Sequence, residues 1–166
     1  MSRYVLVVPR DCGGKYIRVI SRYRVDKNFV TTIREFLKRS HDFSYFQLFR
    51  TAFEIDVITQ ETTNTVSVYS VNNRGVETRH YCVQREMRDN VVIGTVKFGD
   101  HTVDDRTDGL VRREVTWEGG LDKPRITIFS RYNDGTEAKY RYMFMNENSK
   151  RFFVFEETRG LVNLFN

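Results

Sequence analysis

Short aromatic and β-branched segments, separated at near-regular intervals by turn signals, fill the second half of this 166-residue chain. Several alternate apolar and polar residues, and Asp-Gly and Gly-Gly supply the positive φ angles that hairpin turns need. The pattern predicts an antiparallel up-and-down meander. A long meander hides its edges most simply by closing into a barrel. The four clearest segments are residues 111–117, 125–132, 138–144 and 151–155.

The composition favours a single globular domain with an anionic partner. A hydrophobic fraction of 40% and an aromatic fraction of 14% exclude a disordered chain. The net charge of +5 suits a membrane surface, an acidic ligand head or nucleic acid, although a solvated basic surface without a partner explains it equally well. Cys12 and Cys82 predict free thiols in a reducing compartment. Without a signal-peptide core or a membrane span, we expect a soluble cytoplasmic protein.

The first half predicts one strand, then two short helices, then further strands. Residues 1–13 are predicted to be an N-terminal extension, and residues 14–166 the folded domain. Phe29, Ile33 and Phe36 fall on one helical face after Asn28, which predicts the first helix. A second helix is predicted from the spacing of Phe43, Phe46, Phe49 and Phe53. The remaining strands are expected at residues 15–21, 53–59, 65–71, 76–84, 90–98 and 161–166. The prediction is an all-β fold, a ten-stranded antiparallel up-and-down β-barrel (a β-clam), capped by a two-helix lid after the first strand.

Six short stretches share an order and spacing with a known family. They are Gly14-Lys15-Tyr16, Asn28-Phe29 with residues 33–37, Lys97-Phe98-Gly99, Asp104-Asp105-Arg106, residues 116–120 and Asn133-Asp134-Gly135. Together they resemble the intracellular lipid-binding proteins, the fatty-acid-binding and retinoid-binding family of the calycin superfamily, over roughly residues 13–166. The resemblance implies that the barrel carries one small hydrophobic ligand non-covalently and that the helices form its portal. The family's last-strand Arg-x-Tyr anchor is not matched, since Phe165 stands near the arginine's position.

The resemblance implies Arg141 as the candidate anchor for a ligand carboxylate, because it lies one residue short of the family's earlier arginine position and a guanidinium binds carboxylates in bidentate fashion. The alternative places Arg141 on the outer surface as a cross-strand partner. Aromatic walls with a few polar groups suit a ligand cavity, although core packing explains the same aromatic residues. The predicted ligand-binding residues are Arg141, Tyr142, Trp117, Phe129, Tyr69 and Phe36.

Two further functions remain open. Basic and aromatic residues interleave in 139–142 and 150–153, which suits single-stranded nucleic acid on an outward sheet face. The second alternative is a filled barrel that acts as a structural or partner-binding module. Transient contact with an anionic membrane surface is predicted through Lys27, Arg34, Lys38 and Arg39. His41, His80 and His101 are scattered, and no metal, nucleophile or phosphate motif stands out. We therefore expect no enzymatic activity, no metal and no cofactor.

Overall fold

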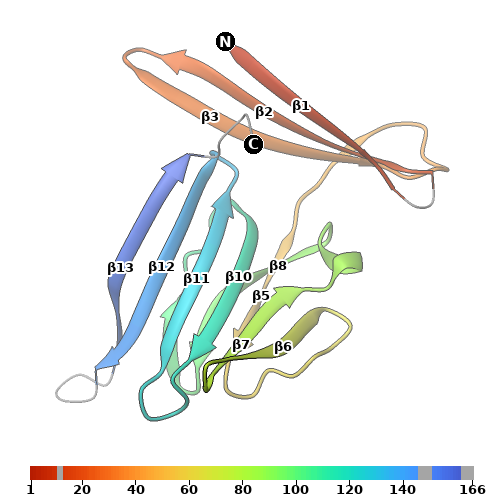
Figure 1. The fold of residues 1–166 in the computed structure, drawn as a ribbon. Helices are drawn as coiled ribbons and strands as arrows, with labels where there is room; N and C mark the ends of the chain where they lie inside the picture. Colours follow the sequence, from red (N-terminus) through yellow and green to blue (C-terminus); the bar gives the residue numbers. More distant parts are fainter. Residues whose placement is uncertain (11–12, 146–150, 162–166) are drawn as a thin grey trace.

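The computed structural model describes residues 1–10, 13–145 and 151–161, which form three β-sheets and one short 3-10 helix (Figure 1). The elements in chain order are β1 (Ser2–Pro9), β2 (Lys15–Val25), β3 (Asn28–Lys38), β4 (Phe46–Gln47), β5 (Thr51–Asp56), β6 (Val66–Asn73), β7 (Val76–Val83), η1 (Arg85–Met87), β8 (Val91–Phe98), β9 (His101–Asp104), β10 (Leu110–Glu118), β11 (Arg125–Tyr132), β12 (Thr136–Met145) and β13 (Arg151–Leu161).

Two sheets form the body of the protein. The larger has the strand order β13-β12-β11-β10-β7-β6, and the smaller has the order β5-β8-β9. Residues on alternate positions of β10, β11 and β12 are buried, as expected for strands with one face against a core. Val115, Ile126 and Ile128 meet Ile55 and Val96 of the smaller sheet in one hydrophobic cluster. The body is therefore a filled two-layer sandwich.

The remaining sheet, with the order β1-β2-β3-β4, lies across one end of the body and is called the N-terminal sheet (Figure 1). Backbone contact fixes this arrangement, because the Ile33 N–H donates to the Asn133 carbonyl at 2.6 Å. Gly135 lies in the β11–β12 turn at φ +85°, and a Cβ there would approach Thr31 Cγ2 to 2.6 Å. Glycine is therefore required where this turn meets β3, for both its backbone angle and its size.

The all-β class and most predicted strands are confirmed, whereas the described residues form no closed barrel. Residues 125–132 coincide with β11, and β6, β7, β8, β10 and β12 lie at or within a few residues of their expected positions. Strands β10 to β13 form the predicted meander. The barrel fails because the strands divide among three separate sheets, and because β5 pairs with β8 in parallel rather than antiparallel.

The first predicted helix is wrong, since residues 28–38 are the strand β3. This segment pairs with β2 over eleven residue pairs, from Val25–Asn28 to Lys15–Lys38. Residues 30–33 are Val-Thr-Thr-Ile, a run of four β-branched side chains that favours a strand over a helix. In the alternation of this strand Ile33 is buried and Phe36 lies on the opposite face, so the helical spacing of Phe29, Ile33 and Phe36 does not mark one apolar face.

The second predicted helix is also wrong, so the two-helix lid does not exist among the described residues. This segment instead contains the two-residue strand β4 and leads into β5. The Leu48 N–H donates to the Glu35 carbonyl at 2.8 Å, which holds the chain in an extended form beside β3. Phe43 and Phe49, expected on the apolar helix face, are exposed.

The chain ends differ from the expected pattern where the structure describes them. Residues 2–9 of the predicted extension form β1 and pair with β2 from Ser2–Arg22 to Pro9–Lys15. The predicted last strand meets β13 only at Leu161, and its residues 162–166, with Phe165, lie outside the described residues. Cys12 lies outside them as well.

Candidate functional site

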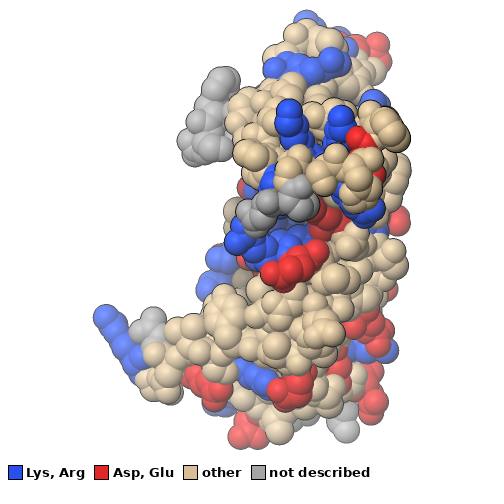
Figure 2. Space-filling model, turned by 90° about the vertical axis from the view of Figure 1, so that its right-hand side faces the viewer, with Lys and Arg blue, Asp and Glu red and all other residues tan. Residues whose placement is uncertain are grey.

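A cleft of about 280 Å³ separates the N-terminal sheet from the body. It is called the arginine cleft. Its lining comes from β1, β2 and β3 on one side and from β7, β8, β10 and the segment 88–89 on the other. Figure 2 shows basic and acidic atoms gathered at the level where these two parts meet. The lining residues are Leu6, Val8, Arg10, Tyr16, Arg18, Glu35, Arg50, Cys82, Val83, Arg88, Asp89, Val91, Val92, Val111, Arg112, Arg113 and Glu114.

One part of the lining is apolar. Leu6 and Val8 point inward from β1, because alternate residues of a strand share a face. Val83, Val92 and Val111 face them from β7, β8 and β10. Aliphatic groups from two separate sheets thus line the same space, which gives the cleft a surface for an apolar ligand group.

The rest of the lining is strongly basic. Six of its residues are arginines and three are carboxylates, so cations exceed anions by three. Arg10 pairs with Asp89 through two hydrogen bonds of 2.9 and 3.0 Å. Arg112 pairs with Glu114 on β10. The excess positive charge within a partly enclosed space favours an anionic ligand.

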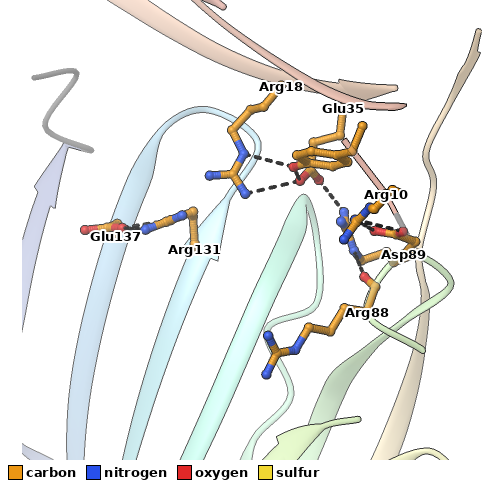
Figure 3. A network of polar contacts seen from close by, with 9 residues as sticks. Arg10, Arg18, Glu35, Arg88, Asp89, Arg131 and Glu137 are labelled. Carbon is orange, nitrogen blue, oxygen red and sulfur yellow. Dashed lines mark hydrogen bonds and ion pairs between the residues drawn. The ribbon is translucent and has the colours of Figure 1, made fainter. Parts of the chain in front are cut away.

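Glu35 is the centre of the charged network on the N-terminal sheet (Figure 3). Its side chain is 4% exposed and accepts hydrogen bonds from the Tyr16 hydroxyl and from Arg50 Nη1. Arg18, its direct partner across the β2–β3 ladder, adds a contact of 3.4 Å. Arg50 also donates through Nε to the Arg88 carbonyl. Glu35 therefore links the N-terminal sheet to the segment that leads from η1 into β8.

These contacts keep Glu35 ionised. Burial alone would raise the pKa of Glu35, but the hydrogen bonds from Arg50 and Tyr16 and the charges of Arg50 and Arg18 outweigh burial and lower it. The pKa of Tyr16 is raised to about 12, first by burial and then by the neighbouring Glu35 charge. Tyr16 is accordingly a neutral hydrogen-bond donor at neutral pH.

A second buried network, centred on Asp104, adjoins the cleft through Arg113. The Arg113 side chain is 0% exposed and binds Asp104 Oδ1 at 3.3 Å, Ser130 Oγ at 3.0 Å and the carbonyls of Gly94 and Arg106. Asp104 also accepts from Arg106 and the Tyr142 hydroxyl. Burial would raise the pKa of Asp104, but Arg106, Tyr142 and Arg113 together lower it. This network anchors the cleft wall formed by β10.

The two carboxylates predict acid sensitivity. Their folded-state pKa values lie below the ordinary ones. Their stabilising effect is complete above the unfolded-state pKa values, about 4, and is lost as the pH falls through the lower folded-state values. We expect the free energy of unfolding to fall below about pH 4 and to fall less steeply in Glu35→Gln. Urea unfolding at several pH values measures both slopes, and parallel curves for the two proteins would contradict the assigned role of Glu35.

Two arginines of the cleft retain unused donors. Arg10 Nε is buried and finds no acceptor among the described residues. Arg88 donates to the Val83 carbonyl at 3.3 Å, and no carboxylate among the described residues pairs with it. A buried donor without an acceptor is unfavourable, because it has lost its hydrogen bonds to water. An anion in the cleft would accept a hydrogen bond from Arg10 Nε and would replace the water around the exposed Arg88.

The cleft offers no cation site. In the described residues no three His, Cys, Asp or Glu side chains gather in a way that suits a metal ion. Cys82 lies in the cleft wall as a free thiol. The donors that face the cleft are guanidinium and hydroxyl groups, which bind anions.

The predicted anchor and its neighbours on the body sheet do not surround a common cavity. Arg141 takes the outer position foreseen as its alternative, because its side chain is 41% exposed and binds Glu156 across the β12–β13 ladder at 2.7 Å. Tyr142 points inward and binds Asp104. Trp117 is also buried, packs edge-on against Phe98 and donates through Nε1 to the Gly120 carbonyl at 3.2 Å.

The other three predicted ligand residues lie on different surfaces. Phe129 is half-buried on the outer face of β11, opposite the buried Ile128 and Ser130. Tyr69 is exposed on β6 and stacks on His80 with ring centroids 4.9 Å apart. Phe36 lies on the outer face of β3. The structure therefore brings no ligand site together from these six residues.

The basic residues predicted to contact a membrane are also redistributed. Arg34 and Lys38 share the outer face of β3, while Lys27 lies in the β2–β3 turn. Arg39 lies over the Phe46 ring at 5.4 Å. The aromatic residues of the 139–142 run, Tyr140 and Tyr142, are buried and present no stacking surface for bases.

The arginine cleft was not predicted, because a helix was expected in the segment that forms β3. Tyr16, Arg18 and Glu35 share a face only when both segments are strands in register. A glutamate amid apolar and β-branched residues, between Ile33 and Leu37, was the signal that could have identified a buried charge.

Comparison of the chain with protein families, curated proteins and solved structures finds no match. The similarity to intracellular lipid-binding proteins accordingly stays a prediction. Within the described ranges no helix combines the length and apolar character needed to cross a membrane.

Proposed function

We propose that the arginine cleft binds a compact amphipathic anion, with a carboxylate or phosphate head and a small apolar body. The observation that carries this proposal is the lining itself, which joins aliphatic residues from two sheets to six arginines and only three carboxylates. Apolar walls combined with placed polar groups are typical of small-molecule sites, and the many charged groups of this lining add a preference for an anionic head.

The head group is assigned to Arg88, which pairs with no carboxylate among the described residues, and to Arg10, whose Nε is buried without an acceptor. Guanidinium groups bind carboxylates and phosphates through two parallel N–H donors. The apolar body is assigned to Leu6, Val8 and Val111 on the opposing walls. Each buried methylene contributes about 0.8 kcal/mol to affinity.

The volume limits the size of the ligand. The cleft measures about 280 Å³, and small-molecule sites typically range from about 300 to 1,000 Å³. A medium-chain anion fits this space better than a long-chain fatty acid. The proposal keeps the hydrophobic ligand with an anionic head that the sequence suggested, and moves it from a barrel interior to the space between two sheets.

Octyl phosphate is the first probe, measured by isothermal titration calorimetry. We expect saturable binding of octyl phosphate and octanoate with one ligand per chain. Octanol, which lacks the charge, and inorganic phosphate, which lacks the tail, should each bind more weakly. Equal binding of octanol and octyl phosphate would contradict the role given to the arginines.

Arg88→Ala should weaken octyl phosphate binding about 10-fold or more, because a hydrogen bond to a charged group contributes about 1.5–3 kcal/mol. Arg88 is exposed, so its removal should leave the fold intact. Arg125→Ala is the matched control, since Arg125 is an exposed arginine that pairs with Glu118 outside the cleft. Equal affinity of the Arg88→Ala variant and the wild type would refute this assignment.

A further inference from the structure

Strand β1 is an edge of the N-terminal sheet, and half of its backbone groups have no partner among the described strands. The Arg10 N–H donates to the Gly14 carbonyl at 2.9 Å, at the end where β1 turns into β2. In an antiparallel ladder, residues alternate between pointing toward the partner strand and away from it. Counting back from Arg10, Val8, Leu6 and Tyr4 point toward β2. The N–H and C=O groups of Arg3, Val5 and Val7 therefore point away from the sheet.

Between Arg3 and Pro9, the side chains of β1 offer no protection against strand addition. Residues 4–8 are Tyr-Val-Leu-Val-Val, an uncharged run of aromatic, aliphatic and β-branched residues. Val5 and Val7 are 51% and 53% exposed. Natural proteins usually protect such edges with charges, bulges, short strands or covering loops, since a long apolar edge is a template for another strand.

The edge at β6 carries this protection. Val66 and Val68 point away from β7, and the loop before them occupies their backbone groups. Thr62 Oγ1 donates to the Val68 carbonyl and accepts from the Val68 N–H, both at 3.0 Å. The Thr63 N–H donates to the Val66 carbonyl at 2.8 Å, and Thr63 Oγ1 accepts from the Val66 N–H at 3.0 Å.

Strand β13, the edge opposite β6 in the larger sheet of the body, is protected in another way. The β12–β13 ladder shifts register between Arg141 and Tyr142, which leaves Phe155 as an unpaired bulge residue on the edge strand. Beyond the bulge, β13 carries Glu156, Glu157 and Arg159. The edge strands β4, β5 and β9 have only two, six and four residues. Among the described strands, β1 is thus the long edge without protection.

We propose that β1 pairs antiparallel with β1 of a second copy of this chain, joining two N-terminal sheets into one. The outward groups of Val5 and Val7 are self-complementary about a twofold axis, since each residue supplies one donor and one acceptor. Arg3, the charged residue of β1, lies near one end of the strand, so an antiparallel pair places the two Arg3 side chains at opposite ends. Val5 and Val7 of one copy then lie beside those of the other on the same face.

The partner is a second copy and not an anionic surface, because the pairing groups are backbone amides flanked by uncharged side chains. This inference does not rest on ligand binding in the arginine cleft. The two proposals meet only in Leu6 and Val8, whose side chains line the cleft from the same strand.

Sedimentation velocity of the full chain over a range of concentrations tests the pairing. The wild type should show a concentration-dependent species of twice the chain mass. Val7→Pro should shift it to the monomer and keep the fold, because the Val7 N–H makes no bond to β2 and edge strands accept proline at such positions. Pro9, two residues after Val7, already occupies a position of β1 whose backbone nitrogen points away from β2. Far-UV circular dichroism checks the fold of the variant.

A double variant, Val5→Lys with Val7→Lys, places charges on the same edge and should also be monomeric. It decides the case if Val7→Pro fails to fold. The matched control is Val71→Lys, which charges an exposed valine on β6 and should keep the dimer. A wild type that remains monomeric at every concentration, or a dimer that survives both β1 variants, would overturn the proposal. Octyl phosphate titration of the monomeric variant tests the ligand site independently of β1 pairing. Failure of the pairing proposal and failure of the ligand site can therefore be distinguished.

Discussion

Asp104→Asn is expected to destabilise the fold by about 3–5 kcal/mol, because it leaves buried Arg113 without its counter-charge. The Asp104 side chain is 1% exposed and accepts from Arg106, Arg113 and Tyr142. Asparagine preserves the shape of the side chain and removes its charge. The guanidinium of Arg113 is removed from bulk water, since its side chain is fully buried. Chemical denaturation followed by tryptophan fluorescence measures the loss, with Trp117 as the probe.

Glu156→Gln is the matched control for this variant. It also removes a carboxylate from an arginine pair on the body sheet, but the Glu156–Arg141 pair is exposed. Exposed pairs contribute little, since water and salt screen them. We expect no measurable change in the free energy of unfolding for Glu156→Gln. Similar losses in the free energy of unfolding for Asp104→Asn and Glu156→Gln would contradict the claim that burial makes the Asp104 contacts more stabilising than an exposed pair.

Glu35→Gln is expected to loosen the N-terminal sheet from the body, with a loss of about 3–5 kcal/mol in the stability of that contact. Its carboxylate holds Tyr16, Arg18 and Arg50 together, and Arg50 in turn holds the Arg88 carbonyl. Because local parts of a protein open separately, the effect should be regional. In amide hydrogen exchange, β1 to β3 should lose protection while β10 to β12 keep theirs.

Glu54→Gln serves as its control, since Glu54 is an exposed glutamate that pairs with Lys97 on the body. This variant should leave the exchange rates of the N-terminal sheet unchanged. Uniform loss of protection across all strands in Glu35→Gln would mean that the two parts unfold as one unit. Unchanged exchange would mean that Ile33–Asn133 and the other backbone contacts alone hold the sheet.

The strands of the body could be predicted because their local signals agree with their environment. In residues 125–132, alternation, β-branched residues and flanking turn signals all point to a strand, and β11 has those bounds. In residues 28–38 the signals conflict, since the spacing of three apolar residues suggests a helix while Val30 to Ile33 favour a strand. Pairing with β2 across eleven residue pairs decides the outcome, and it is a long-range interaction that spacing does not reveal.

The closed barrel was not found among the described residues, and the six predicted ligand residues are dispersed, for a related reason. Local alternation predicts strands, but it does not say which strands pair, and here β7 pairs with β10 while β5 pairs with β8. The arginine cleft combines residues from β1, β3, β8 and β10, which only this arrangement brings together. Arg141 was predicted to be the anchor because it lies near an arginine position of the resembled family, yet the strand alternation turns it outward and turns Tyr142 inward.

Titration of the isotope-labelled protein with octyl phosphate, followed by amide chemical shifts, tests the proposed ligand site most directly. Binding in the arginine cleft should shift amides of β1, β8 and β10 that line it, including those of Leu6, Val92 and Val111, in a saturable manner. Amides at the far end of the body, near Gly119, should not respond. No saturable shift, or shifts confined to the outer face of the N-terminal sheet, would contradict the assignment of the cleft as a site for amphipathic anions.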